Sequence, residues 1–328
     1  MRHRLYRIRL RPLTAFATAL RGDTLFGQSC WTLRHALGEA ALGELLRGYT
    51  EGRPFLVLSD AFPAGYLPRP EAPLGLLGYD LGDPGQRKQI KAQRWIDQAA
   101  IAHPLRDWHR FAGSDRDIAR LIGRDDAERC QPLSLRQARG HNSLNRLTGT
   151  TGKGDGFAPY ERELLWHHPA LELELYACCD ERLDETTLAD LLTRLGSHGY
   201  GKDASAGLGK FAVRELQAHA WPHPDAANAW LTLAPSAPQG GAWQAGYCYY
   251  RPHVRFGRHG DQAVQAGSPY KNPLLLADGA ALLTPATAPA GQAFCGQGLG
   301  GLSLNIAGTV HQGYAPVVAV ALDTGARP

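Results

Sequence analysis

Residues 198–211 read HGYGKDASAGLGKF, a loop sequence with four glycines, two lysines and one serine. A phosphate-binding P-loop requires the pattern G-x-x-x-x-G-K-[ST], so that backbone N–H groups surround the phosphates and a hydroxyl reaches Mg²⁺. Both registers fail, because Phe211 in one and Asp203 in the other stand where the hydroxyl is needed. The glycines do not fit the dinucleotide fingerprint G-x-G-x-x-G either. The stretch is therefore a cationic glycine loop of another kind.

The segments on either side of this loop predict a helix and a strand. Before it, DETTLADLLTRLGSHGY offers Asp184 or Thr186 as a helix cap and Gly196 as the residue that ends the helix. Its apolar stripe has helical spacing and consists of Leu188, Leu191, Leu192 and Leu195. After the loop, GKFAVRELQA is typical of a strand.

The first part of the chain holds the matching elements. RLYRIRLRPL alternates apolar with basic residues, which predicts a strand whose basic face is either solvated or an RNA platform. GDTLFGQSCWTLRHALGEAALGELLRGY predicts a long helix with Asp23 as its N-cap and a break at Gly38 or Gly43. PFLVLSDAFP and PALELELYACC predict two further strands.

Without the long insert, the order is strand–helix–strand followed by strand–helix–strand, the ferredoxin-like or RRM arrangement. The glycine loop should then lie at one end of the sheet, beside the turn at residues 21–23. We therefore predict an α+β protein with an RRM/ferredoxin-like N-terminal domain over residues 1–221 and a thumb insertion at about 86–170. Strand-like runs between Gly and Pro turns predict a β-rich C-terminal domain over residues 222–328, for which a second ferredoxin-like domain is one alternative.

The insert is the basic part of the chain. Helical segments are expected within residues 86–102, and LRQARGHNSLNRLTGTTGKGDG predicts a basic hairpin with a flexible tip at 148–156. Between Arg87 and Arg146 the formal charge is +6, whereas the whole chain carries +4. A basic insert on a nearly neutral body fits local contact with nucleic acid, and a solvated charged segment is the alternative.

Composition excludes several classes of protein. With 328 residues, 44% hydrophobic and 20% charged, the chain should be globular rather than disordered. Its six cysteines form no C-x-x-C pair, so reduced and mostly buried thiols are expected, with no zinc site, other metal or cofactor. The basic N-terminal stretch lacks the apolar core of a signal peptide, and no run reaches the roughly 20 apolar residues of a membrane span. We expect a cytoplasmic protein without a membrane partner.

Several motifs together resemble the RAMP superfamily of CRISPR proteins, whose hallmark is a loop like GYGKDASAGLGKF before the last strand of an RRM-like domain. GDTLFGQSCWTLRHALGE, SDAFPAGYLPRP, NRLTGTTGKGDGFAPYERELLW, SPYKNPLLLADGAALLT and GTVHQGYAPVVAVAL are similar to the fourth Csm subunit of type III-A complexes. The resemblance implies a noncatalytic RNA-binding subunit that caps the 5′ tag of crRNA. Its implied partners are the crRNA tag, the large polymerase-like subunit and the backbone RAMP subunit, which it would join.

The residue types of the loop suit RNA. Glycine lets a ribose-phosphate chain approach the backbone, and N–H groups in such turns form anion-binding nests. Unstacked bases need aromatic or guanidinium surfaces, for which Tyr249 is a further candidate unless it packs in the core. The predicted RNA-binding residues are Gly199, Tyr200, Gly201, Lys202, Ser205, Gly207, Gly209, Lys210, Arg21, Arg146, Arg251, Tyr270 and Lys271.

Two other functions stay open. Some RAMP relatives are metal-independent endoribonucleases that process crRNA with a histidine general base, and His35 occupies a similar place on the first helix. The apolar residues around His35 favour a partly buried structural role instead, and no acid partner can be assigned from the sequence. Other candidate histidines are His198, His253 and His311. Backbone-type relatives cut RNA with a loop aspartate, but helix capping accounts for Asp23. The third class is an RNA-binding or protein-interaction module outside CRISPR.

Overall fold

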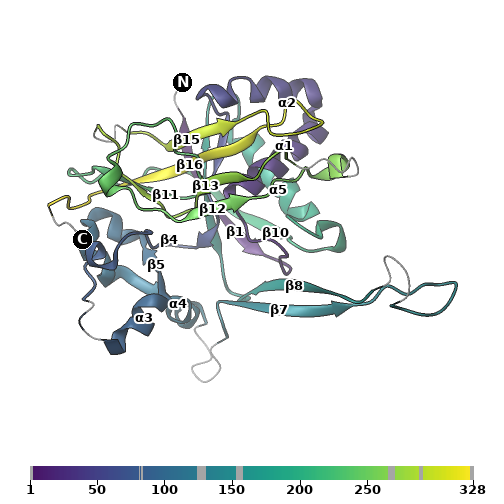
Figure 1. Cartoon of the computed structure of the whole chain (residues 1–328), viewed down its shortest axis with the longest axis horizontal. Coiled ribbons are helices and arrows are strands. Elements are labelled where there is room, and N and C mark those ends of the chain that lie inside the picture. Colours follow the sequence, from purple (N-terminus) through teal and green to yellow (C-terminus); the bar gives the residue numbers. More distant parts are fainter. Residues whose placement is uncertain are drawn as a thin grey trace.

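The computed structural model describes residues 3–80, 82, 84–123, 131–152, 158–264, 270–287 and 291–325. It is an α+β structure built from antiparallel sheets, as predicted (Figure 1). Short 3-10 helices connect the main elements: η1 Tyr49–Glu51, η2 Leu74–Leu77, η3 Pro84–Gln86, η4 Gln98–Ala102, η5 Leu105–Phe111, η6 Ala204–Ala206, η7 Ala245–Tyr247 and η8 Asp261–Val264.

The first sheet has the strand order β10-β1-β9-β2, and short β3 also pairs with β9. Alternation in β1 is confirmed, because its apolar side chains are buried and its arginines lie on the other face. There Arg9 donates to the buried Glu174 at 3.0 Å, and Arg7 lies 3.8 Å from Glu215, so carboxylates compensate these two arginines, whereas Arg11 on the same face is exposed. The strands are β1 Arg4–Pro12, β2 Leu56–Leu58, β3 Phe62–Pro63, β9 Leu173–Cys179 and β10 Phe211–Ala218.

Helices α1 (Gly22–Leu37) and α5 (Glu185–His198) pack against each other, and α1 also contacts β2. The predicted break occurs at Gly38, where φ is 90°, and α2 (Glu39–Leu46) follows. Asp184 caps α5 as predicted by accepting from Thr187 N. Gly196 does not end α5, because the helix continues to His198; a Cβ on Gly196 would lie 2.3 Å from the Phe211 carbonyl oxygen, so this glycine allows close helix–strand packing.

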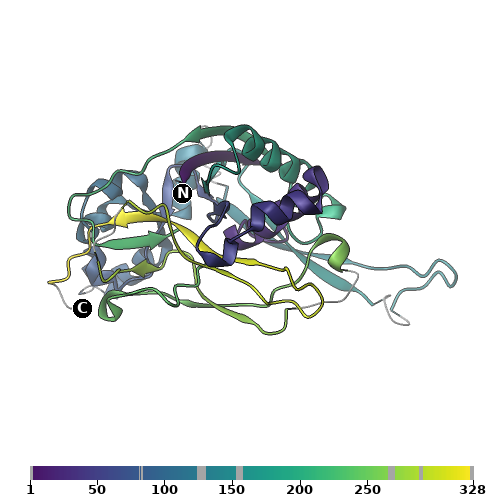
Figure 2. The same cartoon turned by 90° about the horizontal axis from the view of Figure 1, so that it is seen from above.

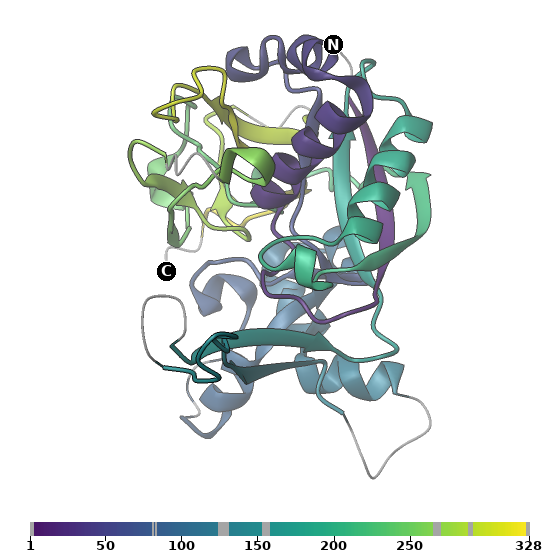
Figure 3. The same cartoon turned by 90° about the vertical axis from the view of Figure 1, so that its right-hand side faces the viewer.

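The C-terminal part is rich in strands, as predicted. Its main sheet has the order β14-β11-β16-β15, and β12 and β13 form a separate two-stranded ribbon. In Figure 3, α1 lies between these strands and the first sheet, and it contacts β16. Gln312 on β16 bonds the backbone N–H and C=O of Leu58 at 2.9 and 2.7 Å, so the two sheets are directly joined. The strands are β11 Ala229–Thr232, β12 Pro252–Arg255, β13 Leu274–Ala277, β14 Leu282–Leu283, β15 Phe294–Leu299 and β16 His311–Val320. The domain boundary at residues 221/222 stays a prediction.

The insert has two parts. One carries α3 (Arg87–Ala92) and α4 (Asp115–Ile122) and supplies β5 and β6 to a small three-stranded sheet, β4-β5-β6, whose first strand precedes the predicted insert. Residues 86–102 are therefore only partly helical: Gln93–Asp97 is strand β5 because it pairs on both sides, with β4 (Tyr66–Pro68) and β6 (Ala112–Ser114). The other part is the predicted basic hairpin, β7 (Ser134–His141) and β8 (Tyr160–His167), which projects from the body (Figures 1 and 2). Part of its predicted flexible tip lies outside the described residues.

Candidate nucleic-acid interface

The glycine loop is fastened to the segment between β1 and α1, which we call the 13–21 segment after its residues. Thr18 Oγ1 accepts from Lys202 N at 3.1 Å, and Thr14 Oγ1 accepts from Lys210 N at 2.9 Å. Arg21 N donates to Tyr200 Oη at 3.1 Å, so the loop lies beside the start of α1 as predicted. The sequence offered little to identify Thr14 and Thr18 as partners of the loop, since they are two isolated hydroxyl residues in the mainly apolar stretch LTAFATAL.

Three of the four loop glycines are required by contacts within the protein. A Cβ on Gly199 would lie 2.5 Å from Leu208 O, one on Gly209 would lie 2.0 Å from Tyr200 O, and one on Gly201 would lie 2.7 Å from Thr18 Cβ. All have positive φ, which L side chains adopt poorly. Only Gly207 has open space where its Cβ would point. Packing within the protein therefore accounts for the glycine at these three positions, and contact of the loop glycines with RNA stays a prediction.

The loop's polar side chains divide into exposed and enclosed ones. Lys202 and Ser205 are exposed and Lys210 is half-buried, and neither lysine forms an ion pair among the described residues. Tyr200 is fully buried, and its hydroxyl donates to Ala19 O at 2.9 Å. The prediction that Tyr200 offers a surface to a base is thus wrong, because this side chain closes the loop onto the 13–21 segment.

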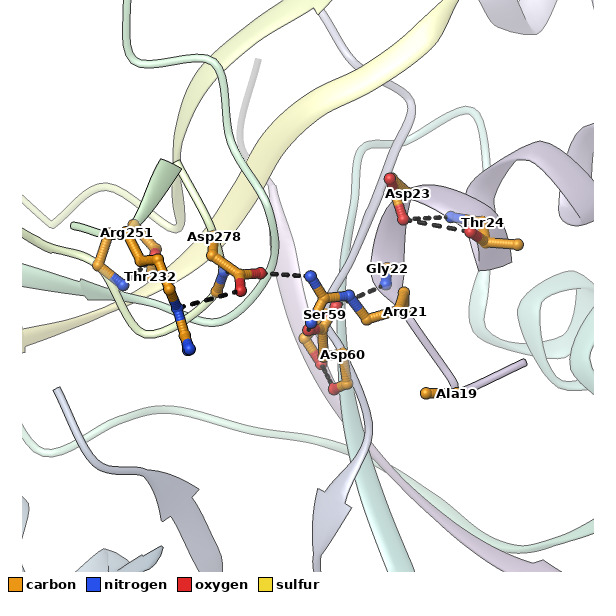
Figure 4. Close-up of polar contacts among 12 residues, drawn as sticks. Ala19, Arg21, Gly22, Asp23, Thr24, Ser59, Asp60, Thr232, Arg251 and Asp278 are labelled. Carbon is orange, nitrogen blue, oxygen red and sulfur yellow. Dashed lines mark hydrogen bonds and ion pairs between the residues drawn. The ribbon is translucent and has the colours of Figure 1, made fainter. Parts of the chain in front are cut away.

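Arg21 is occupied by carboxylates (Figure 4). Its guanidinium lies 3.3 Å from Asp60 and also pairs with Asp278. Burial raises the pKa of Asp60 to about 7, although Arg21 and the N–H of Gly22, which donates at 2.8 Å, favour its charged form. Arg251 is likewise paired, at 2.5 Å from Glu71 and 3.8 Å from Asp278. Both arginines are thus paired with carboxylates of the protein. Arg21 is largely enclosed, whereas the Arg251 side chain is 63% exposed, and RNA contact by either stays a prediction.

Asp23 lies at the centre of a second buried cluster. It does not cap α1, whose N-cap is Arg21; instead it accepts two hydrogen bonds of 2.7 Å from Arg255, at the end of β12. His311 Nε2 on β16 lies 3.4 Å away. Burial alone would raise the pKa of Asp23, but His311 and Arg255 outweigh it and hold this pKa well below its usual value. The cluster anchors α1 to the C-terminal strands, and His311 is buried within it.

The other predicted residues are spread over the C-terminal part and the hairpin. Burial raises the pKa of Tyr270 to about 12, and its ring packs edge-on against His259 and His311. Tyr249 packs against the core, which was the alternative to its role as a surface for a base. Lys271 and, near the hairpin tip, Arg146 are exposed, and neither forms an ion pair in the part of the chain that the structure describes.

His35 differs from its prediction. Its side chain is 56% exposed rather than partly buried, and Nε2 lies at hydrogen-bonding distance from Asp261 in η8. The sequence could not show this pairing, because the two residues are far apart in the chain. His198 Nδ1 faces Arg194 O at 2.7 Å, and His253 is half-buried. Within the described ranges, no His, Cys, Asp and Glu group is suited to hold a metal ion, and no helix is long and apolar enough to cross a membrane.

No protein-family model and no curated protein matches the chain, but solved structures do. A chain in the crystal structure of a Csm1-Csm4 cassette in complex with cA4 matches with a TM-score of 0.59 and 16% identity, over 98% of this chain and 100% of that one. A chain in the crystal structure of the Csm1-Csm4 cassette in complex with pppApA matches with a TM-score of 0.58, with the same identity and coverage. A chain in the crystal structure of the Csm3-Csm4 subcomplex matches with a TM-score of 0.56 and 11% identity, over 93% of this chain and 98% of that one.

The fold is therefore one used by subunits of type III-A CRISPR-Cas complexes. Csm4 is the component common to both kinds of assembly, so the chain is Csm4-like in fold, and the resemblance seen in its motifs is confirmed.

Proposed function

We propose that the chain is a noncatalytic subunit of a type III-A CRISPR effector complex that caps the 5′ tag of crRNA. It would join the large polymerase-like subunit to the backbone filament. Likeness in fold supports these assembly partners. Over nearly its whole length, the chain resembles a chain of an assembly that contains Csm1 and a chain of an assembly that contains Csm3. The sheet order β10-β1-β9-β2 supports the ferredoxin-like form of the N-terminal unit.

The two lysines of the glycine loop carry the RNA-binding part of the proposal. Lys202 and Lys210 have no carboxylate partner among the described residues, in contrast to Arg21 and Arg251. Their backbone N–H groups are fixed by Thr18 and Thr14, so the loop presents both ammonium groups from a defined backbone. Such a rigid cationic loop suits phosphates of a single strand.

Replacing Lys202 and Lys210 together by alanine is expected to weaken binding of crRNA and flatten its salt dependence. Loss of two phosphate contacts should reduce the slope of log K against log salt by about 1.4 for a single strand. Fluorescence anisotropy across a salt series measures this slope. The matched control is Lys88→Ala with Lys91→Ala, which removes two exposed lysines from α3. Equal slopes for the loop variant and the wild type would contradict contact between these lysines and RNA.

A second candidate function is favoured by one observation, the contact between His35 and Asp261 on the surface. A carboxylate that orients an imidazole is a common arrangement for a general base, here one that would activate a ribose 2′-OH. The scaffold proposal predicts no cleavage when the purified chain is incubated with repeat RNA in EDTA. Cleavage that is abolished by His35→Ala but not by His198→Ala would replace the scaffold proposal with a metal-independent ribonuclease.

A further inference from the structure

The outward face of the β12–β13 ribbon is apolar and exposed. Successive side chains of a strand point to opposite faces, and residues that pair across two antiparallel strands share a face. Val254 of β12 pairs with Leu275 of β13, and Tyr250 and Phe256 lie an even number of residues from Val254, on either side of it. These four side chains, which we call the ribbon face, are each between 51% and 72% exposed. A soluble protein seldom exposes such a group of large apolar side chains together unless it binds a partner.

The inward face of the ribbon is fixed to the body. Arg255 of β12 donates two hydrogen bonds to the buried Asp23 on α1, and Leu276 of β13 is buried. The ring of Tyr270 fills the space in which a Cβ on Gly257 would lie, so the chain just beyond β12 is closely packed as well. The ribbon face therefore points away from α1 and cannot turn inward.

Two cations border the ribbon face at one end. Arg258 lies two residues after Phe256, and Lys271 lies three residues before β13. A hydrogen bond of 3.2 Å from Tyr270 N to Gly257 O holds these two stretches together. Both cationic side chains are exposed, and neither forms an ion pair with a carboxylate that the structure describes. A complementary partner would present apolar side chains flanked by carboxylates.

The composition of the ribbon face favours a protein over RNA as its partner. Its centre, Val254 opposite Leu275, is aliphatic and offers no ring or guanidinium plane on which a base could stack. A nucleic-acid strand also needs cations along its path, whereas both cations lie at one end of this face. Large apolar side chains with a charged rim are instead typical of the centre of a protein interface.

The position of the ribbon face separates it from the proposed RNA contact. In Figure 3 the C-terminal strands, which include the ribbon, lie on one side of α1, and the first sheet lies on the other. The glycine loop belongs to the side of the first sheet, because it connects α5 to β10. A subunit that joins two partners needs two surfaces, and a filament subunit that follows the guide RNA would lie on the loop side. The ribbon face is then left for the large subunit.

We propose that the ribbon face binds the large polymerase-like subunit, which would cover Val254, Phe256 and Leu275 with apolar side chains and pair carboxylates with Arg258 and Lys271. The inference rests on the proposed function and assigns one of its two protein partners to named residues. Lys271 would then contact a carboxylate rather than the RNA phosphate expected from the sequence.

The first test measures binding of the immobilised full-length chain to the purified large subunit by biolayer interferometry, without RNA. Leu275→Ser and Phe256→Ser, tested singly, should each weaken this binding about 10- to 100-fold, mainly through faster dissociation, because each removes an apolar anchor from the centre of the interface. The matched control is Leu121→Ser, which removes a similarly exposed leucine from α4 and should bind like the wild type. All three side chains are exposed, so the urea midpoints of the variants should equal that of the wild type.

The second test concerns charge. Charges at the rim of an interface act mainly on association, so Arg258→Ala should lower the association rate constant and make it less dependent on salt, with little change in the dissociation rate constant. Arg120→Ala, which removes an exposed arginine from α4, is the control and should leave both rate constants unchanged. An unaltered salt dependence in Arg258→Ala would overturn the pairing with carboxylates.

The outcomes separate this surface from the proposed function. If the wild type binds the large subunit and Leu275→Ser and Phe256→Ser bind it equally well, the ribbon face is refuted and the function stands. If the wild type does not bind the large subunit at all, both are refuted. The two variants might instead lose crRNA, the backbone subunit or self-association while they keep the large subunit. Any of these results would assign the face to RNA, to the filament or to a second copy of the chain, and would overturn the proposal.

Discussion

Replacing Asp23 by alanine is expected to lower the free energy of unfolding by about 3–5 kcal/mol, the usual effect of removing one partner of a buried ion pair. The carboxylate is fully buried and accepts both hydrogen bonds from Arg255, whose guanidinium would be left without its counter-charge. His311, only 7% exposed, would lose its acidic neighbour as well. Urea denaturation followed by circular dichroism measures the change.

The control is Glu39→Ala, which removes an exposed carboxylate that pairs with Arg34 and should change stability by less than about 1 kcal/mol. The pH dependence has a defined sign. Because the folded-state pKa of Asp23 lies below its ordinary value, the unfolded chain takes up the proton first as the pH falls. The stabilisation is complete above about pH 5 and declines below the ordinary aspartate pKa of about 4. In Asp23→Ala this decline should be shallower than in the wild type, because the share of Asp23 is lost while other carboxylates with a lowered pKa, such as Glu174, keep theirs. A loss of stability as small as that of Glu39→Ala would contradict the cluster's role.

The elements whose side chains follow a simple period could be predicted from the sequence. Alternation fixed the direction of the side chains of β1, and the leucines of α5 marked its buried stripe. The strand at Gln93–Asp97 could not be predicted, because its conformation depends on pairing with β4 and β6 rather than on local propensity. Gly196 was misread for a similar reason. A glycine that ends a helix and a glycine that allows close packing look the same in the sequence, and only the contact with Phe211 distinguishes them.

The candidate site was predicted as a region more accurately than as a set of side chains. The loop lies beside the start of α1 as expected, but whether a cation is free depends on carboxylates that are remote in the sequence. Arg21 meets Asp60 and Asp278, whereas Lys202 meets no described carboxylate, although both are basic residues next to glycine. The side chains that share a face of the hairpin could not be predicted either, because this follows from strand register, which the sequence of a long hairpin leaves open.

Gly209→Ala is expected to destabilise the protein by about 2–4 kcal/mol and to abolish binding of crRNA. The residue has φ of 72°, which costs an alanine about 1–2 kcal/mol, and its Cβ would lie 2.0 Å from the Tyr200 carbonyl oxygen. The loop would have to open, breaking the 2.9 Å bond from Tyr200 N to Gly209 O and shifting the buried Tyr200 hydroxyl from Ala19 O. Each buried hydrogen bond lost adds about 1 kcal/mol.

Gly207→Ala is the matched comparison, because Gly207 has a φ of 85° but open space at its Cβ position. It should lose only the backbone contribution of about 1–2 kcal/mol and stay folded at 25 °C. The RNA affinity of this variant then tests whether RNA approaches the backbone at Gly207. A loss of affinity in the folded Gly207→Ala variant would mean that a ribose-phosphate chain lies against this residue. Equal losses of stability in the two variants would show that Gly209 does not close the loop on Tyr200.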